Sequence, residues 1–145
     1  MRHLKRIVAF VAVLAMSVSS VGTVYAASGS NGPQASPTLT SYGVWLKPGT
    51  TKGELRVSFD VTATDKADSL GVSYFEIHRA SNDELVETVR GTTSNGLKSS
   101  GFSYAHTYSY DGTSGMACYA IVAIYAEIDG IFDSRTLRTP VVTVP

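Results

Sequence analysis

The segment from Glu54 to Thr64 alternates between polar and apolar side chains without a single exception. A period of two indicates a β-strand with one face in the core and the other in water. The side chains expected to point inward are Leu55, Val57, Phe59, Val61 and Ala63. A slip of one residue would bury Arg56 and Asp60, so the pairing of this strand is strongly specified. The segment predicts a half-buried strand of a sheet.

Further strands are predicted along the chain by runs rich in β-branched and aromatic residues between turn residues. These runs cover 39–46, 72–79, 84–90, 103–110, 116–128 and 135–144. The polar segments 65–71 and 92–101 are predicted loops, and Asp129-Gly130 is a predicted turn. Pro140 confines the last strand to an edge or a bulge, because proline cannot donate to a ladder.

Seven short strands, no amphipathic helix and a core supplied by alternating residues predict an all-β protein. We expect a single immunoglobulin-like antiparallel β-sandwich of about seven strands, because residues 38–145 have the length usual for that class. A small barrel is the alternative. The sequence leaves the choice between sandwich and barrel open.

The N-terminus has the parts of a secretory signal peptide. Its basic residues are Arg2, Lys5 and Arg6. Residues 7–24 are mostly apolar and lead to small side chains at a cleavage site between Ala26 and Ala27. An uncleaved anchor is the alternative, but the strongly apolar part, residues 7–16, is shorter than the roughly 20 residues that span a bilayer.

These features predict a signal peptide over 1–26, a flexible leader over 27–37 and a β-sandwich domain over 38–145. The leader is rich in Ser, Gly, Asn and Pro and shows no apolar periodicity. We expect the mature protein to be secreted, to have no membrane contact after cleavage and to be a monomer.

The charge of the mature chain argues against nucleic acid as a partner. The signal peptide takes three of the twelve basic residues and none of the twelve acidic ones, which leaves a net charge of −3. The remaining Lys and Arg residues are scattered singly along the sequence. A nucleic-acid site needs a basic patch or stripe, and no such pattern is present.

No catalytic constellation stands out. Cys118 is the only cysteine, so the chain has no internal disulfide, and its place in the most apolar strand predicts burial. A nucleophilic set of Cys118, His106 and Asp111 can be written down, but a buried thiol is a poor nucleophile. We therefore expect no enzymatic activity.

The sequence also predicts no metal site and no cofactor. His78 and His106 lie on separate predicted strands, whereas a zinc site needs three or four clustered donors. The paired loop carboxylates are Asp65 with Asp68 and Asp129 with Asp133. They lack the close spacing of a calcium loop and are ordinary turn residues. Near Gly112 and Gly115 there is neither a P-loop lysine nor a following helix.

Aromatic residues are the one feature that points to a ligand. The candidate binding surface consists of Tyr104, His106, Tyr108 and Tyr110 on one face of a strand, together with Trp45, the only tryptophan. Exposed rings could stack on sugars or anchor a protein partner. The alternative is that these rings cover the edges of the core.

Two functions therefore stay open. The first is a structural or interaction module that contacts an unknown protein or the cell envelope. The second is a carbohydrate- or peptidoglycan-binding module that uses exposed tyrosines.

Two resemblances support these expectations. The stretches Ser73–Ala80 and Tyr119–Ala126, the latter followed by Asp129-Gly130, resemble fibronectin type III and related immunoglobulin-like domains. A second likeness covers nearly the whole mature chain and rests on Phe59–Thr64, Ser69–Val72, Thr93–Leu97, Tyr108–Gly115 and Asp133–Thr136. In these stretches the chain resembles a group of short exported proteins of Gram-positive anaerobes with no established function. The resemblance implies the fold and export, and no activity.

The chain departs from that group at one position. Where this chain has Cys118, the group usually has tyrosine. The departure implies that the cysteine carries no function shared with the group.

Overall fold

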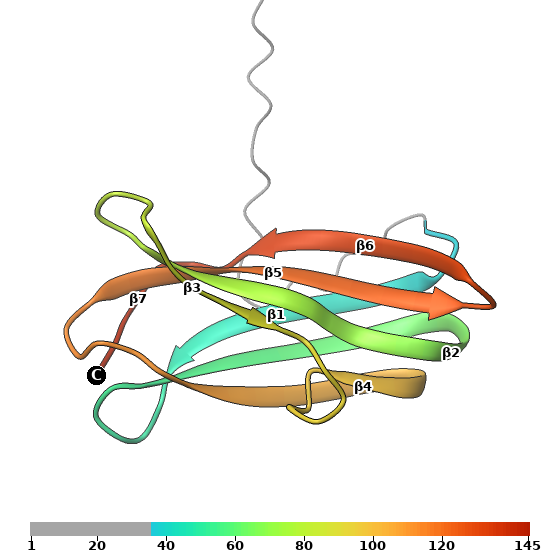
Figure 1. The fold of residues 1–145 in the computed structure, drawn as a ribbon, viewed down its shortest axis with the longest axis horizontal. Helices are drawn as coiled ribbons and strands as arrows, with labels where there is room; N and C mark the ends of the chain where they lie inside the picture. Colours follow the sequence, from blue (N-terminus) through green and yellow to red (C-terminus); the bar gives the residue numbers. More distant parts are fainter. Residues whose placement is uncertain (1–35) are drawn as a thin grey trace, which may run out of the picture.

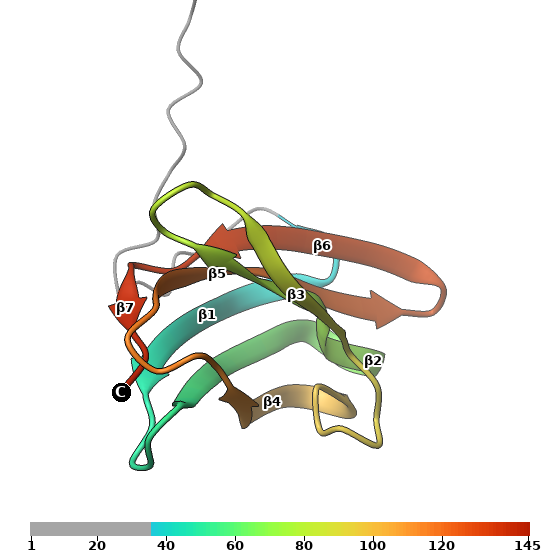
Figure 2. The same ribbon diagram turned by 60° about the vertical axis from the view of Figure 1, so that its left-hand side comes forward.

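The computed structural model describes residues 36–145, so the expected signal peptide and nearly all of the expected leader lie outside the described residues. The described chain is all-β, and none of residues 36–145 is helical. Its strands are β1 (Leu39–Pro48), β2 (Glu54–Arg79), β3 (Leu85–Arg90), β4 (Lys98–Asp111), β5 (Ala117–Ile128), β6 (Ile131–Arg138) and β7 (Val142–Thr143). All pairings are antiparallel, and the sheet curls into a half-barrel (Figure 1, Figure 2).

The long strand β2 organises this sheet. Its first half pairs with β1 and β4, and its second half pairs with β3 and β5. β5 then pairs with β6 and, at its beginning, with β7. At the right-hand end of Figure 1, β2 turns back, so that its two halves run in opposite directions. One strand therefore joins both parts of the sheet.

The predicted loop over residues 65–71 is wrong, because β2 continues through it. Ala67 pairs with Gly101 of β4, and Leu70 pairs with Ala126 of β5. Ala67 and Leu70 are buried. The polar residues between them face outward, so their polarity marks an exposed bend of a strand and not its end.

The predicted last strand is two strands, β6 and β7, separated by residues 139–141, and β6 begins at Ile131, before the predicted start. At the break, the Thr139 side chain accepts the N–H of Ala120 at 2.9 Å, in place of a ladder partner. Pro140 has no N–H to continue the ladder. Seven strands are thus present as predicted, but two predicted strands have merged into β2 and one has split.

The alternation predicted for the first half of β2 is confirmed. Its five apolar side chains are at most 6% exposed and belong to one core cluster. Phe75 and Ile77, from the second half of β2, are fully buried in the same cluster. If fully buried, a side chain of this size contributes about 1.5 to 3 kcal/mol. Both halves of β2 therefore face one shared core.

β5 lies between β2 and β6, and its apolar character on both faces is explained by this central place. The side chains that it sends into the core are Cys118, Ala120, Val122, Ile124 and Ala126. On its other face, Tyr119 is covered by the stacked ring of His78 and by the guanidinium of Arg138. The predicted burial of Cys118 is confirmed.

The beginning of the described chain is fastened to the sheet. The hydroxyl of Ser36, in the expected leader, donates to the carboxylate of Asp133 and accepts the N–H of Leu39. Within residues 36–145 there is no helix of the length and apolarity needed to cross a membrane.

Candidate functional site

The four predicted rings of β4 face the core side of the sheet. In the ladder with β2, Tyr110, Tyr108, His106 and Tyr104 lie opposite the buried Leu55, Val57, Phe59 and Val61. Tyr110 is buried at 7% exposure, and the other three rings are half-buried. The rings therefore close the open edge of the core.

Ring contacts hold this edge together. Phe59 makes edge-to-face contacts with Tyr104 at 5.8 Å and with His106 at 6.4 Å between ring centroids. Tyr108 meets Phe75 in the same way at 5.4 Å. Such pairs contribute about 0.5 to 1.5 kcal/mol beyond the area that they bury. These contacts use the rings for packing.

Polar contacts complete the cover. The Tyr104 hydroxyl donates to the carbonyl of Gly96 at 2.8 Å, in the connection between β3 and β4. Burial is the larger cause, and a hydrogen bond to Glu87 the next, of the rise in the pKa of Tyr110 to about 12. The β4 rings are thus not an open aromatic strip.

Trp45 lies on the opposite face of the sheet. It pairs with Ser58, and Ser58 pairs with Thr107, so these three residues form a row across β1, β2 and β4. Side chains of a strand alternate between faces, and Ser58 is out of phase with the buried Val57 and Phe59. The structure therefore places the Trp45 side chain on the other face of the sheet from the other four predicted side chains, although His106 borders one hollow together with Trp45.

Two further rows lie beside the Trp45 row. They consist of Gly43, Asp60 and Ala105, and of Ser41, Thr62 and Ser103. Asp60 is thus flanked in its own row by a residue without a side chain and by a residue with only a methyl group. This lack of bulk leaves open space beside its carboxylate.

Two hollows follow from this arrangement, and they share Asp60 and Ala105. One hollow, of about 370 Å³, extends to Ser41, Thr62 and Ser103. The other, of about 530 Å³, extends to Trp45, Ser58 and Thr107. We call their joint surface the outer trough, with the residues Ser41, Trp45, Ser58, Asp60, Thr62, Ser103, Ala105 and Thr107.

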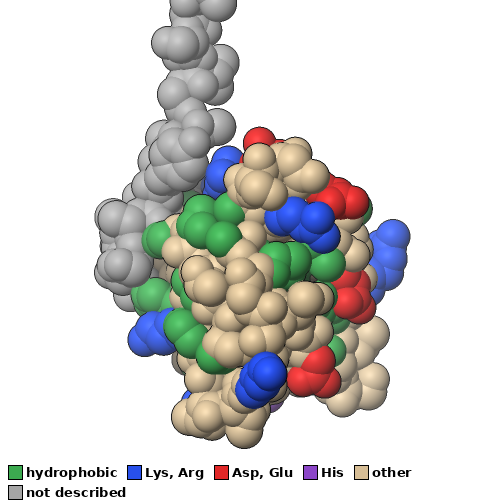
Figure 3. Space-filling view, turned by 90° about the vertical axis from the view of Figure 1, so that its left-hand side faces the viewer, with side chains coloured by type: hydrophobic (Ala, Val, Ile, Leu, Met, Phe, Trp, Pro, Cys, Tyr) green, Lys and Arg blue, Asp and Glu red, His purple; other side chains and the backbone are tan. Residues whose placement is uncertain are grey.

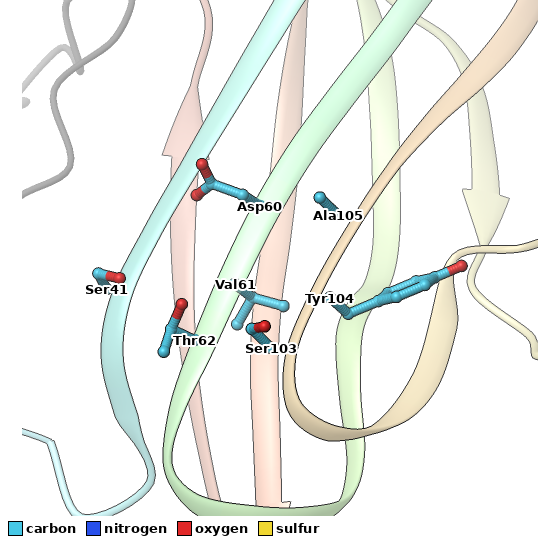
Figure 4. Close-up of a pocket in the computed structure, with 7 residues that line it drawn as sticks. All are labelled: Ser41, Asp60, Val61, Thr62, Ser103, Tyr104 and Ala105. Carbon is cyan, nitrogen blue, oxygen red and sulfur yellow. The ribbon is translucent and has the colours of Figure 1, made fainter.

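Figure 4 shows the Ser41 end of the outer trough. The carboxylate of Asp60 reaches from β2 toward β1, away from Ala105. Tyr104 also borders this hollow, but its ring points away toward the connection between β3 and β4. The Asp60 carboxylate is therefore the charged group of this end.

The electrostatics of Asp60 agree with its position. Burial raises the pKa of its carboxyl above the ordinary value, and the backbone N–H of Gly43 opposes the shift. No ion pair within residues 36–145 includes Asp60. The nearest charged row carries Lys47 and Arg56, and Arg56 is paired with Glu54 at 3.1 Å. Asp60 accepts the backbone N–H of Gly43, and its remaining acceptor positions, with no ion pair to occupy them, are available to a ligand.

Another hollow, of about 380 Å³, lies at the end of the molecule where β5 begins. It is lined by Arg79, Ser81, Thr113, Gly115, Met116 and Ala117. Its only charged side chain, Arg79, is paired with Glu84 at 3.3 Å. Basic and acidic side chains are interspersed on this end, and neither sign gathers into a patch there (Figure 3).

The structure does not assemble the nucleophilic set considered from the sequence. His106 and Asp111 are five residues apart on β4 and so point to opposite faces of the sheet. Cys118 faces the core, and burial raises the pKa of its thiol. A protonated thiol in the core is chemically inert.

Within residues 36–145, no three His, Cys, Asp or Glu side chains gather as a metal site would require. Of the carboxylates predicted to lie in loops, Asp68 lies in β2 and Asp133 lies in β6. Asp68 accepts the N–H of Asp129 at 2.9 Å, and Asp133 contacts Arg135. His78 contacts Glu76 at 2.9 Å and stacks on Tyr119.

No protein-family model, curated protein or solved structure matches this chain. The site must therefore be argued from its own geometry. Sequence reasoning selected Trp45 but missed Asp60, which it interpreted as an ordinary outward residue of an alternating strand. The signal that could have found it is the pairing of Asp60 with Gly43 and Ala105, which only the sheet register reveals.

Proposed function

We propose that the protein is an exported, non-catalytic interaction module, built on an immunoglobulin-like, fibronectin type III-like β-sandwich. It contacts a protein or a cell-envelope glycan through the outer trough. The observation that carries the proposal is the combination of Trp45 and Asp60 on one hollowed sheet face.

The strand pairing supports the sandwich part of the proposal. The first half of β2 groups with β1 and β4, and its second half groups with β3, β5 and β6. Phe59 from one group and Phe75 from the other meet in one core cluster. Two groups of strands that share a core in this way match the layers of a sandwich.

The trough supports the binding part. A binding site is usually concave, with an aromatic or apolar contact and a few convergent polar groups. The outer trough has Trp45, the carboxylate of Asp60 and a set of hydroxyls. Cys118 and the rings of β4 are engaged in the core or at its edge, so they offer no comparable surface.

Of the aromatic residues predicted to bind carbohydrate, Trp45 still supports that alternative. The tyrosines do not, because Tyr104, Tyr108 and Tyr110 are packed against the core. Trp45 is partly exposed and lines a hollow together with Ser58 and Thr107.

The proposal is tested by co-sedimentation with cell envelopes of the producing organism. Wild-type protein is expected to sediment with the envelopes, and Trp45→Ala is expected to stay in solution. Phe132→Ala removes an aromatic ring that is 57% exposed on β6, away from the trough, and is expected to behave as wild type. Equal sedimentation of all three proteins, or of none, would contradict the proposal.

A further inference from the structure

Five of the eight residues of the outer trough carry a hydroxyl. Its hydroxyl residues are Ser41, Ser58, Thr62, Ser103 and Thr107. Each hydroxyl can both donate and accept a hydrogen bond. In the part of the chain that the structure describes, the only hydrogen bond between two of these hydroxyls joins Ser58 and Thr107, at 2.9 Å. A ligand rich in hydroxyls matches such a lining, because either partner can take either role.

A protein partner fits this lining less well. The centre of a protein interface is usually formed by several large aromatic or aliphatic side chains in a dry patch. The outer trough has one such side chain that faces outward, Trp45, and its other apolar residue in that direction is Ala105. This face of the sheet therefore has too few large apolar side chains to exclude water from the centre of a protein interface.

The charge of the outer trough further limits the class of ligand that can bind there. Among residues 36–145, Asp60 is the only Asp, Glu, Lys or Arg that lines the two hollows. A carboxylate there repels anionic polymers, but it accepts strong, charge-assisted hydrogen bonds from hydroxyl groups. Asp60 lines both hollows, so hydroxyl donors of a ligand can approach its carboxylate from either one.

Trp45 supplies the second contact. The face of an indole ring carries partial negative charge, so it attracts the partly positive C–H groups on the flat side of a sugar ring. The trough extends from the Trp45 row to the Ser41 row, which are four residues apart on β1, or about 14 Å. This length accommodates more than one sugar ring.

We propose that the outer trough binds a neutral polysaccharide, with one pyranose ring stacked on Trp45 and the hydroxyls of an adjacent ring donating to Asp60. This inference rests on the proposed function, since it names the ligand class of the same site. It assigns the envelope contact to glycan and not to protein.

Envelope treatment provides the first test. Protease-digested envelopes are expected to retain the wild-type protein, whereas envelopes oxidised with periodate, which cleaves vicinal diols, are expected to release it. Release by protease but not by periodate would overturn the glycan assignment. If Trp45→Ala still failed to bind untreated envelopes, this result would leave the proposed function intact. Sedimentation that does not depend on Trp45 would overturn both.

The single tryptophan allows a direct second test, because emission excited at a wavelength that tyrosine does not absorb reports on Trp45 alone. Titration with protein-free envelope polysaccharide is expected to change this emission saturably. Asp60→Asn should weaken binding by about tenfold, the size expected for loss of one charge-assisted hydrogen bond. Asp111→Asn, an exposed carboxylate at the end of β4, is the matched control and should bind as wild type. Equal affinity of Asp60→Asn and wild type, or an unchanged emission, would contradict the inference.

Discussion

Cys118 has no exposed surface and faces the core from β5. Burial raises the pKa of its thiol, so the nucleophilic thiolate is scarce as well as shielded. In a chain with a single cysteine, this side chain alone could form a disulfide with another chain. Its burial makes such a link inaccessible to the folded protein.

Native protein is therefore predicted to react with a thiol reagent far more slowly than denatured protein. It should also run as a monomer without reductant. Cys118→Ser should lose about 1 to 3 kcal/mol of stability, because it buries a hydroxyl for which the core offers no assured partner. Labelling kinetics and denaturant unfolding measure these effects. Rapid labelling of the folded protein, or a dimer sensitive to reductant, would refute the prediction.

Residue patterns could predict the inward side chains of β2, but not those of β4. Aliphatic and charged residues differ sharply in their preference for the core, which makes the alternation around Phe59 unambiguous. Tyrosine has an apolar ring and a polar tip, so Tyr104 and Tyr108 suit either face. Only the register of β4 against β2 shows that their rings turn toward Phe59 and Phe75.

The turn between β1 and β2 is held by the carboxylate of Glu54. It accepts the N–H of Thr50 at 3.0 Å, the Nε–H of Arg56 at 3.1 Å and the hydroxyl of Ser109 at 3.1 Å. These contacts, led by the bond from Arg56, lower the pKa of Glu54 from 4.5 to about 2. The turn is thus stabilised by the ionised form.

Because the folded pKa lies below the unfolded one, this stabilisation is complete above about pH 4.5 and is lost as the pH falls toward about 2. Glu54→Gln should make stability less dependent on pH in that window. The effect is expected to be modest, since the side chain of Arg56 is 41% exposed and solvent screens its pair with Glu54. Thermal unfolding of both proteins above and below the window tests this, and parallel pH profiles would disprove it.

Gly71 lies where β2 passes from one group of partners to the other. It has a φ of +135°, and a Cβ there would stand 2.2 Å from the carbonyl oxygen of Leu97. That oxygen also accepts the N–H of Val72 at 2.8 Å, so it cannot move without loss of a hydrogen bond. Gly101 has a similar φ of +124°, but no atom lies within 4 Å of its Cβ position.

Gly71→Ala is predicted to cost about 3 kcal/mol or more, from backbone strain and overpacking together. Gly101→Ala should show the strain alone, at about 1 to 3 kcal/mol. Denaturant unfolding of the two variants side by side separates the contributions. Equal losses would mean that the contact between Gly71 and Leu97 is not tight.

Element boundaries could be predicted where turn chemistry is strong, as at Asp129-Gly130, which both have positive φ. The bend of β2 could not be predicted, because it pairs with residues that lie 30 to 60 positions away along the chain. Ala67 pairs with Gly101, and Ser69 pairs with Glu127. Local polarity at Asp65 and Lys66 indicated a loop, and long-range pairing overrode it.

The N-terminal sequence predicts that the exported protein is cleaved at a site that lies outside the described residues. Mass spectrometry of the secreted protein is predicted to find an N-terminus at Ala27 or within a residue or two of it, because Ala26 completes the cleavage site. Protein that retains Met1 would refute export by cleavage.

The all-β class could be predicted because alternation and turn residues are local signals. The outer trough could not, because it arises where Trp45, Asp60 and Ala105 meet from three strands. These residues are separated in sequence by 15 and 45 positions, and nothing local distinguishes them. The site is a property of the assembled sheet.

The pairing of β2 with strands before and after it in the chain also determines the order in which the fold can form during synthesis. The second half of β2 needs β5, which begins only at Ala117, and β6 can pair only after β5 is in place. A growing chain that stops before Ala117 therefore lacks its central strand and cannot close its core. Until nearly its full length has been made, the chain therefore stays unfolded, which is the state that the predicted export would require.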